Sequence, residues 1–213
     1  MPDAYVDAAA YRLRTGNQAT GTDGVLNEVL LTASRLLDRE LGYAPGHLGP
    51  ISSTTYRFDA HGGALLRLRD NAGFQYMLRT ITTDSLALDT DADGSFDDYL
   101  WDFADAWVRG VPENAVTHGE AYSGLELMTH LSTAPLSEWP TQRDCIRITG
   151  TWGMAAVPGA IQELVVDLAR NLRQRQLAGG ISVPSVDESL PISGSMWPVL
   201  RRARDEFSKR IPI

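Results

Sequence analysis

One segment constrains the fold of this chain more than any other: residues 144–180 join a short strand, a Gly-Thr-Trp-Gly turn and an amphipathic helix. The strand, Cys-Ile-Arg-Ile-Thr at 145–149, is mostly β-branched or small and apolar, which is typical of a half-buried strand. Gly150 and Gly153 bracket Trp152, and because glycine tolerates a sharp turn, the indole can be directed into a core. The segment is therefore interpreted as a structural part and not as a reaction site.

The helix is predicted to begin at Pro158, because the fixed φ and missing N–H of proline suit a first turn. Apolar residues recur at spacings of three and four, with polar residues on the opposite side. The apolar face consists of Ile161, Leu164, Val165, Leu168, Ala169 and Leu172. Gly179 and Gly180 are expected to end the helix.

Residues 1–42 predict two further helices. A short one covers about residues 6–13 and ends near Gly16. The second begins at Thr22 or Asp23 and ends at Gly42. Its apolar face consists of Leu26, Val29, Leu30, Ala33, Leu36, Leu37 and Leu41. We expect this helix to pack against the 158–178 helix and to form the body of the fold.

Residues 52–150 change to an alternating period. Thr54, Tyr56 and Phe58 share one side, and Gly62 with Gly63 predicts a hairpin turn. Further short runs follow at 65–68, 77–88, 99–101, 124–131 and 145–149. The alternation and turn signals indicate about six strands. This block is therefore predicted to be a mainly antiparallel β insertion.

Residues 181–195 are predicted to be a linker and residues 196–213 a tail helix. The tail helix is the most basic part of the chain. The predicted fold class is α+β: a small α-helical bundle with a β insertion and a C-terminal tail helix. Residues 1–213 are interpreted as one domain, in which 151–180 is the core helix. Trp152 is predicted to lock the β insertion onto the helical body.

The composition excludes several classes of function. A formal net charge of −8 argues against a protein that grips nucleic acid, which needs clustered Lys and Arg. Cys145 is the only cysteine, so no intrachain disulfide or Cys-based zinc site can form, and we expect it to be a small buried residue. No apolar run of about twenty residues could span a bilayer, and the first residues lack a secretory signal, so we expect an intracellular protein.

The sharpest chemical motif is Asp89-x-Asp91-x-Asp93-Gly94-x-x-Asp97, which copies the opening of an EF-hand calcium loop. The twelfth position is Leu100, where a bidentate Glu is required, and the flanks predict strands. An acidic hairpin loop is the favoured interpretation, and a weaker loop-bound Ca²⁺ is the alternative.

Other candidate groups do not converge in the sequence. The four histidines, His47, His61, His118 and His130, are expected to be surface loop residues and not metal ligands. The acidic side chains that could form a catalytic pair are expected to be a solvated face, namely Glu120, Glu126, Asp97 and Asp98. The tryptophans are expected to be core or interface anchors, namely Trp101, Trp107, Trp139, Trp152 and Trp197. We therefore predict no catalytic residue, no cofactor and no metal.

Two stretches resemble the head-to-tail connector (adaptor) family of tailed bacteriophages. In the C-terminal half the match is carried by Thr149, Gly150, Trp152, Gly153, Val157, Pro158, Ile161, Leu164, Leu168, Ala169 and Leu172. In the second helix it is carried by Ala33, Ser34, Leu37 and Asp38. The order of helices, β insertion, Trp-Gly turn, helix and tail also agrees with this family over nearly the whole chain.

The resemblance implies a structural virion protein and not an enzyme. Such a protein forms a ring, typically dodecameric, below the portal, extends the DNA channel and contacts the next neck, stopper or tail protein. It implies a location at the neck of the virion, with assembly in the host cytoplasm. DNA would pass through without sequence-specific binding, and no membrane is involved. The tail at 196–213 is the expected portal-docking element, through Trp197, Leu200, Arg201, Arg204 and Phe207.

Two alternatives remain. One is another neck ring of the virion, such as a stopper or tail-completion protein. The other is a calcium- or carbohydrate-binding β module that uses the 89–97 loop with Trp101 or Trp107. The second alternative predicts a monomer with a small ligand, whereas a connector predicts a ring.

Overall fold

The computed structural model of this protein describes residues 4–16, 23–97, 99–101, 108–111, 121–129, 136–177, 197, 198, 200 and 201. The chain divides into two compact units, and each is described by itself. Met1–Gly49 and Ala156–Ile213 form a helical unit, and Pro50–Ala155 forms a β unit. The fold is α+β. Among the described residues, no helix is long and apolar enough to cross a membrane.

The helical unit contains α1 (Ala8–Thr15), α2 (Asp23–Leu41) and α3 (Gly159–Leu177). Asp7 caps α1, because its Oδ1 accepts a hydrogen bond from the Ala10 N–H at 2.6 Å. Gly16 and Gly42, with φ of +67° and +77°, follow α1 and α2 in left-handed backbone that suits glycine. The N-terminal helix begins two residues later than its sequence pattern predicted.

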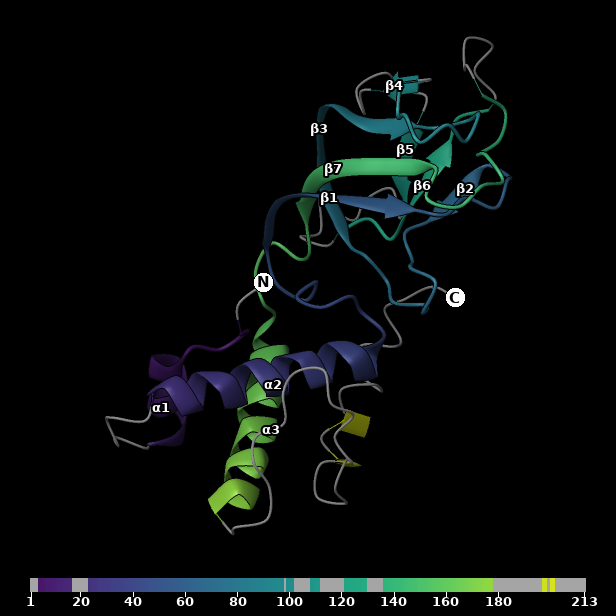
Figure 1. Cartoon of the computed structure of the whole chain (residues 1–213). Helices are drawn as coiled ribbons and strands as arrows, with labels where there is room; N and C mark the ends of the chain where they lie inside the picture. Colours follow the sequence, from purple (N-terminus) through teal and green to yellow (C-terminus); the bar gives the residue numbers. More distant parts are fainter. Residues whose placement is uncertain are drawn as a thin grey trace. The chain divides into compact units, whose positions relative to one another are not determined.

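The prediction that α2 packs against α3 is confirmed, and Figure 1 shows the two helices crossing. The apolar faces predicted for both helices are buried except at Leu41 and Leu172, which are half-buried. Leu30, Leu37, Val165 and Leu168 are fully inaccessible. Each such side chain contributes about 1.5–3 kcal/mol through removal of apolar surface from water. The contact between α2 and α3 therefore provides the main core of this unit.

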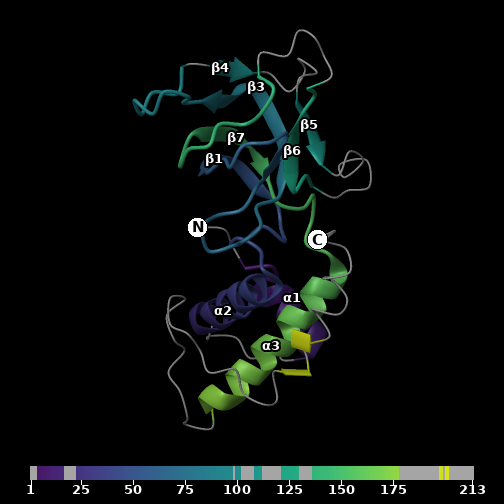
Figure 2. The same ribbon diagram turned by 90° about the vertical axis from the view of Figure 1, so that its right-hand side faces the viewer.

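The β unit contains two antiparallel sheets (Figure 2). The first has the order β1 (Ile51–Phe58), β7 (Ile146–Trp152), β3 (Leu78–Leu88) and β4 (Tyr99–Trp101). The second has the order β2 (Leu65–Arg67), β6 (Gly124–Leu127) and β5 (Val108–Val111). β5 was not predicted from the sequence. Its four residues include a glycine, and the alternation of apolar and polar residues is too short to be recognised.

The core of the β unit contains side chains from both sheets, among them Phe58, Leu66, Leu125 and Ile148. Trp152 belongs to this core, which corrects the prediction that it locks the β insertion onto the helical body. Its indole N–H donates to the Thr54 carbonyl at 2.8 Å, and its ring lies edge-on to Tyr56 at 4.9 Å between centroids. β7 continues through Gly150 and Trp152, so the predicted Gly-Thr-Trp-Gly turn is wrong: its first three residues are strand, and only Gly153 lies beyond β7. Trp152 anchors the end of this strand inside its own unit.

Candidate functional site

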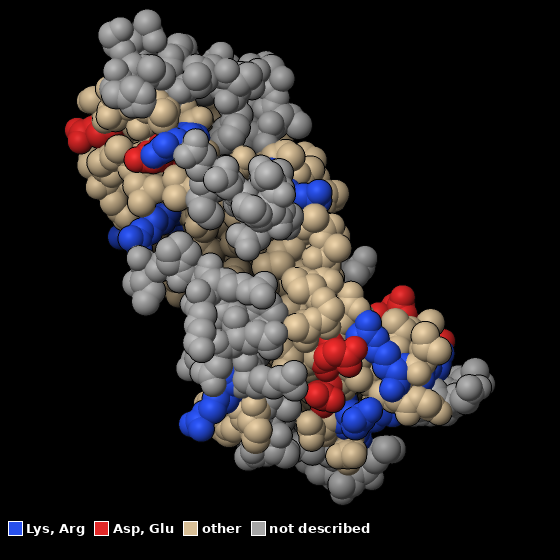
Figure 3. Space-filling view, turned by 180° about the vertical axis from the view of Figure 1, so that it is seen from behind, with Lys and Arg blue, Asp and Glu red and all other residues tan. Residues whose placement is uncertain are grey.

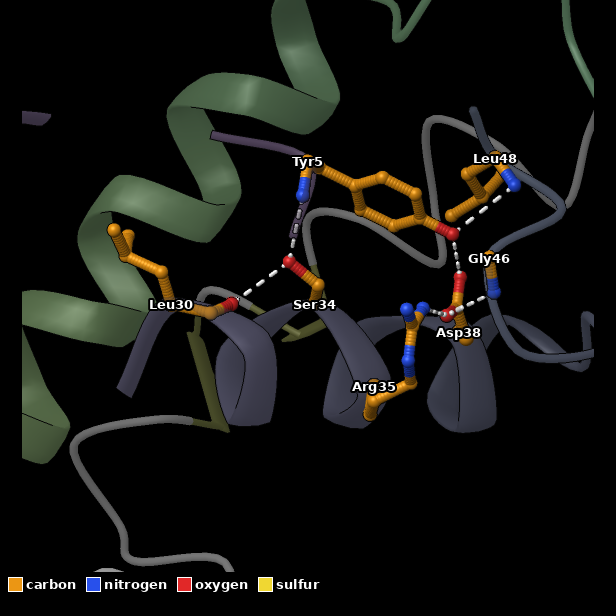
Figure 4. Close-up of polar contacts among 7 residues, drawn as sticks. All are labelled: Tyr5, Leu30, Ser34, Arg35, Asp38, Gly46 and Leu48. Atoms are coloured by element: carbon orange, nitrogen blue, oxygen red, sulfur yellow. Dashed lines mark hydrogen bonds and ion pairs between the residues drawn. The ribbon is translucent and has the colours of Figure 1, made fainter. Parts of the chain in front are cut away.

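A buried polar network ties the N-terminal segment to α2 (Figure 4). The Tyr5 N–H donates to Ser34 Oγ at 3.1 Å, and the Tyr5 hydroxyl donates to Asp38 Oδ1. The same hydroxyl accepts the Leu48 N–H at 3.1 Å. Asp38 Oδ2 accepts the Gly46 N–H at 2.9 Å and an Arg35 guanidinium N–H at 2.8 Å. One carboxylate thus holds three separate parts of the helical unit together.

Burial controls the protonation of this network. Asp38 is 1% exposed, and its loss of hydration raises the pKa of the carboxyl group to about 6, against the hydrogen bonds and the Arg35 charge that favour the anion. Burial, followed by the negative charge of Asp38, also raises the pKa of the Tyr5 phenol far above its ordinary value. The phenol therefore remains a hydrogen-bond donor to the carboxylate throughout the neutral range.

The residues that carry the resemblance in α2 are the ones that build this site. Ala33 and Leu37 are fully buried on the apolar face, and Ser34 and Asp38 supply the two acceptors for Tyr5. Ser34 Oγ also donates to the Leu30 carbonyl at 2.8 Å. Sequence reasoning identified this four-residue motif but missed Tyr5. No spacing rule connects a tyrosine before α1 with acceptors 29 and 33 positions later.

The acidic loop between β3 and β4 is folded by its own carboxylates. Asp89 is 6% exposed and accepts the N–H groups of Ala92 and Gly94 at 2.8 and 3.0 Å. Asp93 accepts the Ser95 N–H at 2.7 Å, and Asp91 accepts the Asp93 N–H at 3.2 Å. This is the turn chemistry expected of an acidic hairpin. The flanking elements are strands, as predicted, so the loop is not an EF-hand.

A cation could still fit this loop. One carboxylate oxygen from each of Asp89, Asp91 and Asp93 lies within 4.8 Å of the others, and Asp91 and Asp93 are exposed. Carboxylate oxygens suit Ca²⁺, but three of its usual six to eight ligands is an incomplete set. The same three carboxylates already accept backbone N–H groups, so the loop can keep its shape without an ion.

Phe96 fastens the same loop to the sheet. Its ring is only 7% exposed and lies between two guanidinium groups, those of Arg57 on β1 and Arg147 on β7, at 4.9 and 4.8 Å. The two arginines face each other across the strand pair. A shared aromatic ring gives each cation a favourable contact that offsets their mutual repulsion. Sequence reasoning missed this role.

An open pocket of about 360 Å³ lies in the β unit beside β2. Its polar lining includes Asp59, His61, Arg67, Asp70 and Trp139. Both carboxylates in the lining already hold backbone N–H groups. Asp59 accepts the Asp144 N–H at 2.8 Å, and Asp70 accepts two backbone N–H groups of its own turn. No serine, threonine, cysteine or lysine is among the described residues that line it.

The remaining candidate residues fall into distinct settings. Cys145 is buried as expected, and this burial raises the pKa of its thiol. His61 is exposed, whereas His47 is fully buried, which corrects its interpretation as a surface residue. Glu126 forms an ion pair with Arg109 at 2.7 Å, and Asp97 is exposed. His118, His130, Glu120, Asp98 and Trp107 lie outside the described residues, as does the side chain of Trp101.

The predicted docking tail is described at four positions. Trp197 is 52% exposed and Arg201 is exposed, whereas Leu200 is only 3% exposed. Leu200 is therefore engaged within the chain itself, while Trp197 is accessible to a partner. Arg204 and Phe207 lie outside the described residues.

The charged side chains of the helical unit are mixed in sign. Arg12 forms an ion pair with Asp23, and Arg14 forms one with Glu163 at 3.1 Å. Figure 3 shows acidic and basic groups next to one another on the face that it draws. Such a surface differs from the continuous basic patch of a protein that binds the phosphate backbone.

Comparison with protein-family models gives no match for this chain, and comparison with curated proteins gives none either.

Proposed function

We propose that this protein is a structural component of a bacteriophage virion, a head-to-tail adaptor that forms a ring below the portal and contacts the neck or tail protein beyond it. The observation that supports this proposal best is the Tyr5 network. The short α2 motif that resembles the connector family supplies the buried contacts that fix the N-terminal segment and the 43–49 loop. A motif with that role fits a scaffold whose purpose is to hold its shape.

Two further features support the proposal. The β unit is inserted between the two parts of the helical unit, which is the organisation that the resemblance implies. The net charge of −8 suits a channel through which DNA slides, because strong phosphate contacts would hinder passage. The role requires no catalytic group and no cofactor.

Trp197 is the residue through which we propose that the tail docks on the portal, with Arg201 beside it. Trp197 is half-exposed, and tryptophan is one of the side chains enriched at the energetic centre of interfaces. Leu200 has a different role in this proposal: its burial holds the segment in place so that Trp197 is presented.

The test is binding to the portal protein encoded by the same genome, with electron microscopy of the mixture. The chain is expected to form a ring on the portal, and Trp197→Ala should weaken that binding at least tenfold. Leu13→Ala is the matched control, because Leu13 is 86% exposed but lies on α1. Wild-type affinity in Trp197→Ala would refute the docking assignment, and the absence of portal binding by the wild type would refute the function.

A second candidate function rests on the Asp89, Asp91 and Asp93 cluster, which favours a calcium-binding β module. Calorimetry with millimolar Ca²⁺ tests it. Heat of binding in the wild type that is lost in Asp91→Ala would support the module over the adaptor.

A further inference from the structure

The four-stranded sheet has one long open edge. β1 spans eight residues, whereas the other edge strands, β4, β2 and β5, span three, three and four. Short strands, charged residues, proline and β-bulges are the usual protections of an exposed edge. The register shift of β1 lies between Ile51 and Thr54, before its regularly paired run from Thr54 to Phe58. The β1 segment, Ile-Ser-Ser-Thr-Thr-Tyr-Arg-Phe, contains neither lysine nor proline and only one charge.

The register shows which backbone groups point away from the sheet. The Asp89 N–H donates to the Cys145 carbonyl at 2.9 Å, so this opposed pair bonds across β3 and β7. Because bonding alternates along an antiparallel strand, Arg147 also bonds toward β3, and its neighbours bond toward β1. Thr55 and Arg57, which stand opposite Thr149 and Arg147, therefore direct their own N–H and C=O groups outward. Neither residue makes an outward backbone hydrogen bond to another described residue.

The opposite edge of the same sheet offers a partner. By the same alternation, β4 bonds to β3 through Tyr99 and Trp101, so the N–H and C=O of Leu100 point outward. The four strands alternate strictly in direction, so β4 runs opposite to β1. A second copy in the same orientation would thus present its β1 antiparallel to β4 of the first.

Charge is complementary between these edges. β1 carries Arg57 and is followed in the sequence by Asp59, whereas β4 is preceded by Asp97 and Asp98 and followed by Asp102, with no basic residue among them. Opposite charges on neighbouring strands stabilise their pairing, and two copies of β1 would instead bring two arginines to one interface.

We infer that β1 of one copy adds to the β4 edge of the next copy, so that the sheet continues from subunit to subunit. This inference rests on the proposed ring and names the contact that builds it. The contact is heterologous, because two different edges meet, and such contacts close into rings when the rotation between copies allows it. Backbone hydrogen bonds supply the pairing, and the charges select β4 over β1 as the neighbour.

Cross-linking tests the geometry in the full-length chain, alone and mixed with the portal. A double variant that carries both Thr55→Cys and Leu100→Cys is treated with a short bis-maleimide. We expect a ladder of covalent oligomers that extends beyond the dimer. The wild type controls for Cys145, which is buried. Dimers from Thr55→Cys alone would show pairing of β1 with β1 and overturn the inference. Rings seen by electron microscopy without a ladder would also overturn it while leaving the proposed function intact.

Proline tests the backbone contact. Thr55→Pro removes an N–H that points outward, so the sheet of the single copy loses no backbone hydrogen bond, and circular dichroism should show a folded chain. The side-chain bond of Thr55 to the Thr149 hydroxyl is lost equally in Thr55→Ala. Self-association should fall at least tenfold, whereas Thr55→Ala keeps the N–H and should associate as the wild type does. A folded Thr55→Pro chain that associates normally would overturn the inference.

Charge reversal tests partner choice. Arg57→Glu should weaken association, and Asp97→Arg with Asp98→Arg in the same chain should restore it. Arg147→Glu is the matched control, because Arg147 also stacks on Phe96 but lies on the central strand β7. If Arg57→Glu and Arg147→Glu weaken self-association equally, and the Asp97→Arg, Asp98→Arg pair does not restore it, then only the contact with Phe96 matters. That result would overturn the pairing of β1 with β4.

Discussion

The hydroxyl group of Tyr5 donates a hydrogen bond to the carboxylate of Asp38, which lies 33 positions later in the chain, and both side chains are buried. The bond joins a segment that precedes α1 to the last turns of α2. Since Asp38 also holds the Gly46 N–H, the same carboxylate fixes the loop that leads toward the β unit. The network therefore sets the path of the chain at two places where no helix or strand does so.

Tyr5→Phe should destabilise the helical unit. The substitution keeps the ring but leaves the Leu48 N–H without its acceptor and removes one donor from a buried carboxylate, at a cost of about 1–3 kcal/mol. Urea denaturation followed by circular dichroism measures the loss. Tyr11→Phe is the matched control: Tyr11 is 3% exposed in the same unit, and its hydroxyl bonds to no other described residue. Equal losses in the two variants would show that the Tyr5 hydroxyl has no special role.

Stability should depend on pH through Asp38. Burial raises the pKa of this carboxyl group from 3.8 to about 6, so between these values the folded chain holds a proton that the unfolded chain has released. The contribution is fully present below pH 3.8 and is lost as the pH rises through 6. Relative to Asp38→Asn, which cannot titrate, the wild type should lose about 2 kcal/mol of unfolding free energy between pH 4 and pH 7.

The measurement is urea denaturation across this pH range. Asp167→Asn is the control for the loss of an acidic side chain on a helix, because the Asp167 side chain is 47% exposed. Wild-type and Asp38→Asn curves that stay parallel would rule out titration of the buried carboxyl group.

The sequence predicted the parts of the fold in which a regular period is set by burial. The apolar faces of α2 and α3 recur at helical spacing because one side of each helix is buried, and their mutual packing followed from that. The long strands β1 and β3 and the first half of β7 were recognised for the corresponding reason, whereas the last three residues of β7 were predicted as a turn because of their glycine. β5 was missed because four residues carry too little alternation.

The candidate sites were less predictable because they depend on contacts between distant positions. The acidic loop was recognised from its Asp and Gly spacing, since turn chemistry is local. In contrast, the position of Phe96 between two arginines depends on which residues of β1 and β7 face each other. Trp152 was placed in the wrong contact for the same reason: its glycine context indicates burial but not the core in which it is buried.

Asp89→Ala should destabilise the β unit, because two backbone N–H groups of the loop lose a buried acceptor, at a cost of about 1–3 kcal/mol. Asp91→Ala should cost far less, since Asp91 is exposed and accepts one long bond at 3.2 Å. Thermal denaturation in EDTA measures both. If the difference between the variants appears only with added Ca²⁺ and vanishes in EDTA, the carboxylates act through a metal ion and not through the loop backbone.

Gly150→Ala should prevent normal pairing of β3 with β7. A Cβ at this position would lie 2.0 Å from the Thr80 carbonyl oxygen, and a backbone atom in a central strand pair cannot move away without loss of its hydrogen bonds. The expected result is a loss of several kcal/mol, at the upper end of the roughly 1–3 kcal/mol typical of overpacking, or insoluble protein. Gly24→Ala is the matched control, because a Cβ there meets nothing within 4 Å at the start of α2, and it should be neutral or stabilising by up to about 1 kcal/mol. Soluble expression and thermal denaturation compare the two. A Gly150→Ala chain as stable as the wild type would show that β3 and β7 can separate at this point without loss of the fold, and the close approach of their backbones would then not explain the glycine.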